Sequence, residues 1–280
     1  MKPIVVESLK YKYPGTDALA LDDISFEVDE GEVIGIVGKN GSGKTSLSLA
    51  LTGLIPHFFG GAYGGRVLVD GLEVRHSSVT EISERVGYVF DNPFTQMTAA
   101  KYTVYEEVAF GLENLGLNRE EIIRRVDWSL KLLDLEGVKD HHPFNLSGGQ
   151  MQRVAIAGII AMRPKILVFD EPTSQLDPEG TEEVFQVIQN LANEGMTILI
   201  VSHKLEKIAR FCNKIILLHQ GKLVDFDRPQ KVFSRDDLIN YGIQPPIVTR
   251  VCRSLGIRDE KSGYYPVTVE EMRKLVKQNE

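Results

Sequence analysis

The sequence is poor in cysteine and contains no long hydrophobic run, and each absence excludes a class of protein. Only two of its 280 residues are cysteines, Cys212 and Cys252, and they lie in no metal-ligand spacing. We therefore expect reduced thiols, as in a cytoplasmic protein. The N-terminus has no apolar signal core, and no window approaches the roughly 18 continuous apolar residues that span a bilayer. We expect a soluble chain that works at a membrane only through a partner.

An excess of basic residues is also absent. The chain has 32 lysines and arginines against 39 aspartates and glutamates, which gives a net charge of −7. A dedicated nucleic-acid binder normally has a basic patch or a basic overall balance, so this charge disfavours nucleic acid as a partner. The length of 280 residues is enough for one large domain, or for a domain with an appendage.

Apolar and turn patterns divide the chain into three regions and a tail. Up to about residue 90, short strand-like runs such as PIVVESL and LDDISFEV are separated by turn signals, and one helix follows GKNGSGKT. From about 94 to 150, apolar residues recur at helical spacing. From 165 to 220, buried-looking strands alternate with helices, and KIILLHQGKLVDFD has the pattern of a hairpin. This alternation predicts a parallel sheet covered on both faces, with ligands at the carboxyl ends of its strands.

Helix-end signals are clear at two places. The run PEGTEEVFQVIQNLANEG has Asp177 as its N-cap and Gly195 just past its end. The tail from about 235 to 280 contains two short helices, and Thr268 and Glu271 lie in capping-box spacing at the second. Because the tail carries no identifiable chemistry, we expect its apolar stripe to be buried against another surface, where it adds dimer contacts.

The run GKNGSGKT, residues 38–45, satisfies the pattern G-x-x-x-x-G-K-[ST]. It follows the strand-like EVIGIV and opens a helix, which is the context of a P-loop and favours it over an ordinary tight turn. Backbone N–H groups would wrap phosphates, Lys44 would neutralise them and the Thr45 hydroxyl would ligate Mg²⁺. The nucleotide contacts predicted here come from Gly38, Lys39, Asn40, Gly41, Ser42, Gly43, Lys44, Thr45 and Ser46.

Two acids and a histidine follow the next predicted strands. Asp170 ends the apolar run ILVFD, so it can point at the hydration shell of Mg²⁺, and Glu171 is placed to orient or deprotonate a water. His203 lies just past the strand TILIVS, where it can hydrogen-bond the γ-phosphate or the attacking water. Without a P-loop these residues would be interpreted as a solvated strand end and a structural histidine. The other histidines lack such placement and are assigned to surface or packing: His57, His76, His141, His142 and His219.

A second glycine-rich turn, LSGGQ at residues 146–150, leads straight into the apolar-periodic run MQRVAIAGIIAM. A glycine turn that feeds a helix N-terminus favours anions, because free N–H groups and the positive end of the helix dipole face outward. The chain therefore has two candidate phosphate cradles, separated by about a hundred residues.

Five motifs in this order and spacing resemble those of an ABC-type ATPase subunit. They are the P-loop, LSGGQ, ILVFDEP, SQLD at residues 174–177, and His203, and the resemblance covers roughly residues 3–225. It implies an α/β P-loop NTPase fold with a RecA-like core, an N-terminal antiparallel β subdomain, a helical subdomain and a small C-terminal helical appendage. Tyr13 in YKYPG matches the aromatic residue that stacks on adenine in such subunits, with a packed strand-end tyrosine as the alternative.

The resemblance also sets the expected division of the chain and its cofactors. It implies an ATPase domain at residues 1–235, with its helical subdomain at about 94–150, and a dimerising appendage at 236–280. ATP and Mg²⁺ are the implied cofactors. In ABC ATPases two subunits pair head to tail, and the signature motif serves the nucleotide of the other chain. The residues implied to act in trans are Ser147, Gly148, Gly149 and Gln150.

A closer resemblance is to the ATPases of energy-coupling-factor importers, which take up vitamins and metal ions. It is carried by NPFTQ, TVYEEVAFGLENLGL, PFNLSGGQMQRVAIAG and QPPIVTRV. The implied partners are a second ATPase, either identical or a paralogue, a transmembrane coupling protein and a substrate-capture membrane subunit. The implied location is peripheral, at the cytoplasmic face of the cell membrane.

The sequence departs from this family at Asp91, in FDNPFTQ, where glutamine is usual. We expect Asp91 to be a metal ligand. It is either an ordinary replacement or a change that retunes metal dependence and coupling, because close carboxylates repel. The segment 94–118 is the expected docking surface for the membrane partner. Its apolar residues, which core packing would also explain, include Phe94, Met97, Val104, Tyr105 and Phe110.

Two other functions compete with a transport ATPase. A soluble ABC ATPase that acts on nucleic acid or ribosomes is disfavoured by the acidic balance, by the single ATPase cassette and by the lack of a basic arm or long coiled-coil insertion. A P-loop GTPase or kinase is disfavoured because the guanine-reading N-K-x-D is absent and neither class explains LSGGQ.

Overall fold

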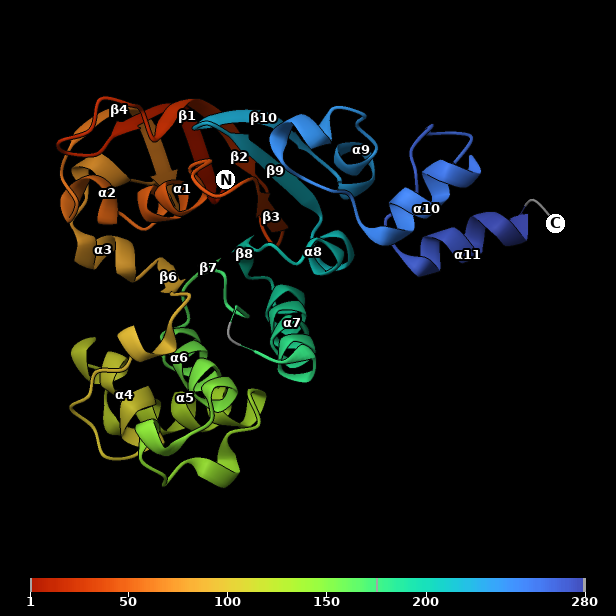
Figure 1. Ribbon diagram of the computed structural model, residues 1–280. Coiled ribbons are helices and arrows are strands. Elements are labelled where there is room, and N and C mark those ends of the chain that lie inside the picture. Colours follow the sequence, from red (N-terminus) through yellow and green to blue (C-terminus); the bar gives the residue numbers. More distant parts are fainter. Residues whose placement is uncertain (1, 175, 279–280) are drawn as a thin grey trace.

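Two β-sheets, a lobe of helices and a C-terminal pair of helices make up the computed structural model (Figure 1). The structure describes residues 2–174 and 176–278, so Gln175 in the SQLD motif lies outside the described residues. Within these two ranges, no helix has the length and apolar character that crossing a membrane requires.

The larger sheet has the strand order β10-β9-β3-β8-β7-β6. Its strands are β3 (Val33–Val37), β6 (Val86–Val89), β7 (Ile166–Asp170), β8 (Thr197–Val201), β9 (Lys214–His219) and β10 (Lys222–Asp227). All neighbours are parallel except β9 and β10, which form the hairpin expected from the sequence. Every residue of β3, β7 and β8 is buried, as expected for parallel strands covered on both faces.

The smaller sheet is antiparallel, with the order β2-β1-β4-β5. Its strands are β1 (Ile4–Lys12), β2 (Leu21–Val28), β4 (Ala62–Val69) and β5 (Leu72–Glu73). Buried and accessible residues alternate along β2, so one face of this sheet packs inward. Helix α1 (Lys44–Leu51) shares a single apolar cluster with this inner face and with Ile34 and Ile36 of β3.

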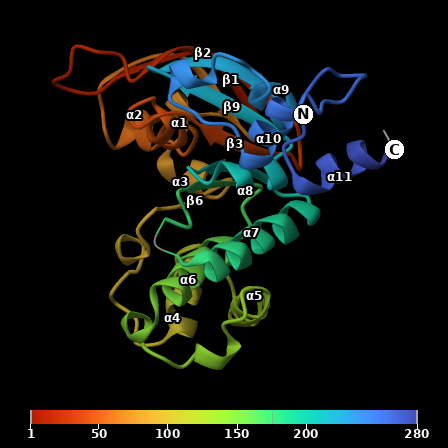
Figure 2. The same cartoon turned by 45° about the vertical axis from the view of Figure 1, so that its right-hand side comes forward.

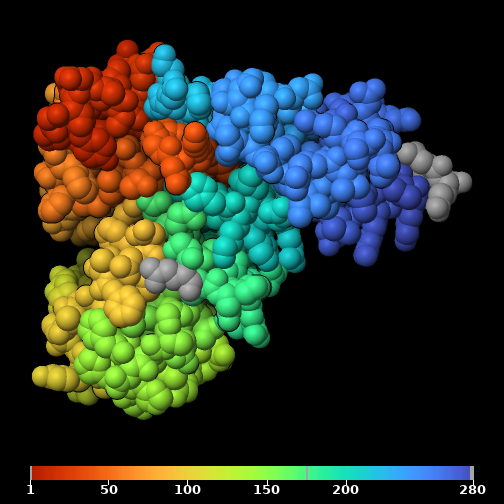
Figure 3. Space-filling model, viewed as in Figure 1, coloured from red at the N-terminus to blue at the C-terminus, as the bar shows by residue number. Residues whose placement is uncertain are grey.

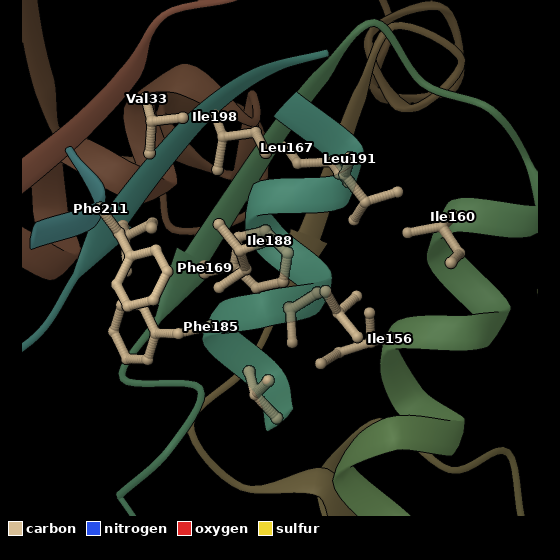
Figure 4. Close-up of a cluster of buried hydrophobic side chains, with 14 of the residues drawn as sticks. Val33, Ile156, Ile160, Leu167, Phe169, Phe185, Ile188, Leu191, Ile198 and Phe211 are labelled. Carbon is tan, nitrogen blue, oxygen red and sulfur yellow. The ribbon is translucent and has the colours of Figure 1, made fainter. Parts of the chain in front are cut away.

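The other face of the parallel sheet packs on helix α7 (Pro178–Asn193). Because side chains alternate along a strand, Leu167 and Phe169 of β7 point to this second cluster, while Ile166 and Val168 join the first. Figure 4 shows Phe185 and Ile188 of α7 beside these strand residues. Ile156 and Ile160 of helix α6 (Gly148–Ala161) belong to the same cluster. As expected, Asp177 caps α7 by accepting a hydrogen bond from the Gly180 N–H at 2.7 Å, and Gly195 has a positive φ of 91° just beyond its end.

The helical lobe consists of α4 (Val104–Asn114), α5 (Arg119–Leu132) and α6 (Gly148–Ala161). Figures 1 and 2 show it below the sheets and joined to them through α6 and α7. Thr103 and Glu106 form a capping box at the start of α4, which fixes where the helix begins. Met97 is only 8% exposed and Val104 is fully buried. These two members of the expected docking surface are therefore core residues, and both belong to the apolar cluster that fills the lobe.

Helices α10 (Ile247–Leu255) and α11 (Val269–Gln278) form the C-terminal appendage, which projects from the body in Figure 3. Arg253 fastens it to the core by donating to the carbonyl oxygens of Ser234 and Arg235, at 3.0 and 3.1 Å. These carbonyls follow α9 (Pro229–Phe233), whose last turn leaves acceptors free.

The capping box expected at α11 is half formed. The Glu271 N–H donates to the Thr268 hydroxyl at 3.3 Å, but the Glu271 carboxylate accepts from the Val267 N–H and from the Gln230 amide. Tertiary contact with α9 has redirected this side chain. The remaining helices are α2 (Leu54–His57), α3 (Val79–Ser83) and α8 (Leu205–Phe211).

Candidate active site

The carboxyl ends of β3, β7 and β8 meet at one edge of the parallel sheet and open into a cavity of 630 Å³. Residues that are far apart in the sequence line it together. The predicted site residues found in its wall are Tyr13, Asn40, Gly41, Gly43, Lys44, Thr45, Ser46, Asp91, Asp170, Glu171 and His203. The sheet edge therefore brings together the P-loop, the strand-end acids and the histidine.

The P-loop closes around its own lysine. Gly43 has a φ of 102°, and a Cβ there would lie 2.7 Å from the Ala20 carbonyl oxygen, so only glycine fits this turn. The Lys44 Nζ donates to the carbonyl oxygens of Gly38 at 2.9 Å and Lys39 at 3.3 Å, which bridges the loop from inside. Burial lowers the pKa of Lys44, and the nearby carboxylates of Glu171 and Asp170 oppose that shift.

A buried donor in the loop has no partner within the described residues. The Ser42 hydroxyl oxygen is inaccessible and makes no hydrogen bond there. A buried polar group without a partner costs free energy. A loop that combines an inward lysine with a helix N-terminus fits a phosphate chain.

Asp170 is 7% exposed, and it accepts hydrogen bonds from the Tyr88 hydroxyl at 3.0 Å and from the Thr45 side chain. Burial raises the pKa of Asp170, and the Asp91 carboxylate also raises it, while the two hydrogen bonds lower it. The Thr45 hydroxyl and the Asp170 carboxylate are thus in contact, and both are hard oxygen ligands of the kind that Mg²⁺ prefers.

No group of three or more His, Cys, Asp or Glu side chains in the described ranges, 2–174 and 176–278, is placed to hold a metal ion. Mg²⁺ is commonly held by one or two carboxylates together with substrate phosphates. The donor set of Thr45, Asp170 and the nearby Asp91 fits that mode. A magnesium ion here would depend on the nucleotide for part of its coordination.

Glu171 combines backbone strain with an unpaired carboxylate oxygen. Its φ of 50° lies in the left-handed region, which a non-glycine residue occupies at a cost, and its N–H donates to the Val201 carbonyl oxygen at 3.0 Å. Among the described residues, its Oε1 has no hydrogen-bond partner. Burial raises the pKa of Glu171 to about 7, although a hydrogen bond from the His203 backbone opposes the shift.

His203 stands opposite this carboxylate. Its Nε2 lies 3.5 Å from the Glu171 Oε1, and its side chain is 54% exposed towards the cavity. Burial lowers the pKa of His203, and the Lys44 ammonium lowers it further against the opposing Asp170 carboxylate, which favours the neutral imidazole. Both side chains line the cavity, next to each other beyond the ends of β7 and β8.

Tyr13 lies at the rim, where its hydroxyl and that of Ser46 are 3.1 Å apart. Its ring packs edge-on against Tyr11, with ring centroids 4.7 Å apart, and it lines the cavity. The placement fits an aromatic contact with a nucleotide base, as the resemblance implied.

Some lining residues were missed by the sequence analysis, most notably Tyr88 and Phe59. Tyr88 is the only half-buried residue in the otherwise buried β6. A tyrosine in an apolar strand was therefore the sequence signal that could have identified it as a lining residue. Phe59 comes from the connection between α2 and β4, where no motif pointed to it.

The LSGGQ segment lies in a separate cavity of 370 Å³ that shares no lining residue with the first. Ser147 caps α6: its hydroxyl accepts from the Gln150 N–H at 3.3 Å, and the Gln150 side chain accepts from the Ser147 N–H at 3.1 Å. The start of α7 forms the opposite wall. The second phosphate cradle therefore does not complete the cavity of its own chain.

Comparison with known proteins extends over nearly the whole chain. Residues 21–174 match the ABC transporter family. A putative ABC transporter ATP-binding protein of Pyrococcus abyssi is 44% identical over 265 residues, which cover 94% of this chain and 92% of the relative. The energy-coupling factor transporter ATP-binding protein EcfA1 of Streptococcus thermophilus is 42% identical over 262 residues, 91% of this chain and 92% of that protein.

Solved structures agree with the sequence matches. CbiO1 from Clostridium perfringens, described as part of the ABC transporter complex CbiONQ, superposes with a TM-score of 0.75 at 32% identity, covering 94% of this chain and 97% of that one. The ATP-binding cassette MJ0796, in a dimeric post-hydrolysis state with ADP and phosphate, gives a TM-score of 0.70 at 28% identity, covering 80% and 98%. With this fold and these relatives, the chain belongs to the ABC transporter ATPases and is an ATP-binding, ATP-hydrolysing subunit of that family.

Proposed function

We propose that the chain is one of two ATPase subunits of an energy-coupling-factor type importer, and that it powers uptake of a vitamin or metal ion through a membrane coupling protein. The observation that carries this proposal is the separation of the nucleotide cavity from the LSGGQ cavity on one chain. The similarity to EcfA1 and to CbiO1 along more than nine-tenths of this chain supports the transporter type.

In the proposed site, residues 38–46 hold the phosphates of ATP, and Tyr13 holds the base. Thr45, Asp170 and Asp91 hold Mg²⁺, which on binding would neutralise phosphate charge and orient the γ-phosphate for in-line attack. Glu171, which lines the cavity, accepts a proton from, or polarises, the attacking water. His203, whose Nε2 lies 3.5 Å from the Glu171 carboxylate, holds that water or the γ-phosphate.

The second half of each site comes from the partner ATPase. Ser147, Gly148, Gly149 and Gln150 present the N-terminus of α6, and we infer that they cap the γ-phosphate held by the partner's P-loop. A dimeric cassette among the similar structures supports the pairing of two such subunits. The partner is a second copy of this chain or a paralogue.

The appendage at residues 236–280 is proposed to add to this dimer. Ile247, Val251 and Leu255 follow one another at four-residue spacing on α10 and are 57%, 43% and 65% exposed. Such a stripe on one helix face is typical of a surface that another chain covers. The buried face of the same helix carries Thr249 and Cys252, and the Thr249 hydroxyl donates to the Pro266 carbonyl oxygen at 2.8 Å.

The helical lobe offers the docking surface for the coupling protein. Phe94 is 52% exposed, and its ring stacks near that of Phe144, with centroids 6.3 Å apart, while Tyr102 is 79% exposed. A groove of 120 Å³ lies beside Gln96 and Phe110. We propose that the coupling protein, which carries the substrate-capture subunit, binds here and holds the chain at the cytoplasmic face of the membrane.

The role of Glu171 is tested by Glu171→Gln. The amide keeps the size but cannot accept a proton, so ATP binding should persist while turnover falls by about 10²-fold or more, and a closed dimer should accumulate. Steady-state hydrolysis and sedimentation with ATP measure the two effects. Glu194→Gln, on an exposed surface outside the cavity, is the matched control. Near-normal turnover in Glu171→Gln would remove Glu171 from this role.

The trans arrangement is tested by Ser147→Arg in mixtures with unmutated subunits. Because Ser147 lies outside the nucleotide cavity, the isolated variant should bind ATP with nearly unchanged affinity. In a mixed dimer the variant should disable the site whose P-loop lies on the unmutated chain. Weaker ATP binding by the isolated variant monomer would argue against head-to-tail pairing.

The interpretation of Asp91 is tested by two substitutions. Asp91→Gln and Asp91→Asn both remove the charge, but only Gln has the longer reach that relatives use. If the charge helps to hold the metal, both should raise the half-saturating Mg²⁺ concentration of hydrolysis by about tenfold, equivalent to about 1.4 kcal/mol. A changed Mg²⁺ dependence in Asp91→Gln but not in Asp91→Asn would show that the length of the side chain matters and its charge does not. No change in Mg²⁺ dependence or in stimulation by the membrane partner would make Asp91 an ordinary replacement.

The transporter assignment is tested by affinity purification of the full chain from detergent-solubilised native membranes. A membrane coupling protein should accompany the unmutated chain and be lost with Phe144→Asp, which places a charge in the exposed aromatic pair. Ile239→Asp, at a residue 67% exposed outside the lobe, should retain it. Recovery of nucleic acid or ribosomes in place of a membrane protein would contradict the proposal.

A further inference from the structure

An aromatic residue from a different segment stands next to Tyr13 in the nucleotide cavity. Phe59 lies in the connection between α2 and β4, and it lines the same cavity as Tyr13, Ser46 and Leu49. The Phe59 and Tyr13 ring centroids are 6.2 Å apart, and the ring planes meet at 86°. Two rings at right angles form a corner, in which a flat base can lie on one ring and meet the other with its edge.

The backbone of this connection is held in place at several points. The N–H groups of Phe58 and Phe59 both donate to the Leu54 carbonyl oxygen, at 2.9 and 3.0 Å. The Gly60 carbonyl oxygen accepts from the Tyr11 hydroxyl at 2.8 Å. On the other side, the His57 Nε2 is 2.7 Å from the Val74 carbonyl oxygen, which accounts for a histidine without catalytic placement. The position of Phe59 relative to β1 is thus fixed by the fold.

Close approach to β1 also explains the glycine that follows. Gly61 has a φ of 93°, and a Cβ there would collide with the Lys12 carbonyl oxygen and with the Tyr11 ring. The chain can therefore pass beside the strand that carries Tyr13 only with glycine at this position. This contact keeps Phe59 at the cavity and leaves Phe58 outside it, 77% exposed.

The side chains around the two rings cannot identify a base by hydrogen bonds. Ala20 and Leu49 are apolar, and the Ser46 hydroxyl is engaged with that of Tyr13. Leu49 lies about one helical turn beyond Thr45 along α1, which separates this part of the cavity from the P-loop lysine. Recognition here depends on contact with aromatic and apolar surface, which favours a two-ring purine over a pyrimidine.

We propose that Phe59 is a second base-binding residue, which together with Tyr13 forms the aromatic corner that selects purine nucleotides. The proposal rests on the ATP site proposed above. Because Phe59 touches only the base, it contributes equally to binding of the ground state and the transition state. Its removal should therefore raise KM and leave kcat unchanged.

The test compares Phe59→Ala with Ile123→Ala. Phe59→Ala should raise the KM for ATP by about 2- to 10-fold, the range of an aromatic pair contact, with a smaller rise for CTP. Ile123→Ala, which shortens an apolar side chain 41% exposed on α5 and outside the cavity, should leave both values unchanged. Tripolyphosphate, which has no base, serves as a competitive inhibitor, and its inhibition constant should be the same in Phe59→Ala and the unmutated chain.

A conservative variant gives a second readout. Phe59→Trp keeps the aromatic wall, and its fluorescence should change with ATP but not with tripolyphosphate. The single native tryptophan, Trp128 in α5, provides the background signal, which is subtracted with the unmutated chain. A KM for ATP in Phe59→Trp close to that of the unmutated chain would show that the rise in Phe59→Ala comes from loss of the aromatic ring. It would exclude a change in the fold of the connection as the cause.

The role of Phe59 and the proposed phosphate site are tested by different variants. An unchanged KM for ATP in Phe59→Ala, or a parallel rise in the tripolyphosphate constant, would overturn the role of Phe59. Lys44→Ala should weaken tripolyphosphate binding whatever happens at Phe59. If Lys44→Ala leaves it intact, the proposed phosphate site itself is wrong.

Discussion

The hydrogen-bonded register of the parallel strands decides where the chemistry of this protein lies. Asp170 and Val201 are paired at the ends of β7 and β8, and the Glu171 N–H continues the pairing to the Val201 carbonyl oxygen. β3 pairs with β8 on the other side, so the P-loop leaves the sheet at the same edge. A slip of one residue would turn Asp170 away from the cavity, because side chains alternate along a strand.

Acidic side chains outnumber the lysine ammonium at the carboxyl edge of the parallel sheet. Three carboxylates, those of Asp91, Asp170 and Glu171, share the cavity with the ammonium of Lys44, and burial raises the pKa values of Asp170 and Glu171. A divalent cation that arrives with a polyphosphate would relieve this repulsion and add the ligands that the protein lacks. The strained backbone of Glu171 is maintained because the strands on both sides are fully buried.

Packed side chains connect the two cavities, although the cavities share no lining residue. Helix α6 presents LSGGQ at its start and packs Ile156 and Ile160 into the cluster that covers β7 further along (Figure 4). Helix α7 forms the other wall of the LSGGQ cavity and lies on the same strand. Packed side chains therefore connect the β7 end to the surface proposed to meet a partner.

The sequence predicts those elements whose structure depends on residues close together in the chain. The P-loop, the buried strands that end at Asp170 and before His203, and the cap at Asp177 depend on neighbouring residues, and the structure has them where the sequence predicts. Tertiary structure alone decided that Val104 is core, that Glu171 is strained and has an unpaired oxygen, and that Phe59 stands beside Tyr13. These features depend on burial and on contacts between segments distant in sequence, which short-range periodicity does not encode.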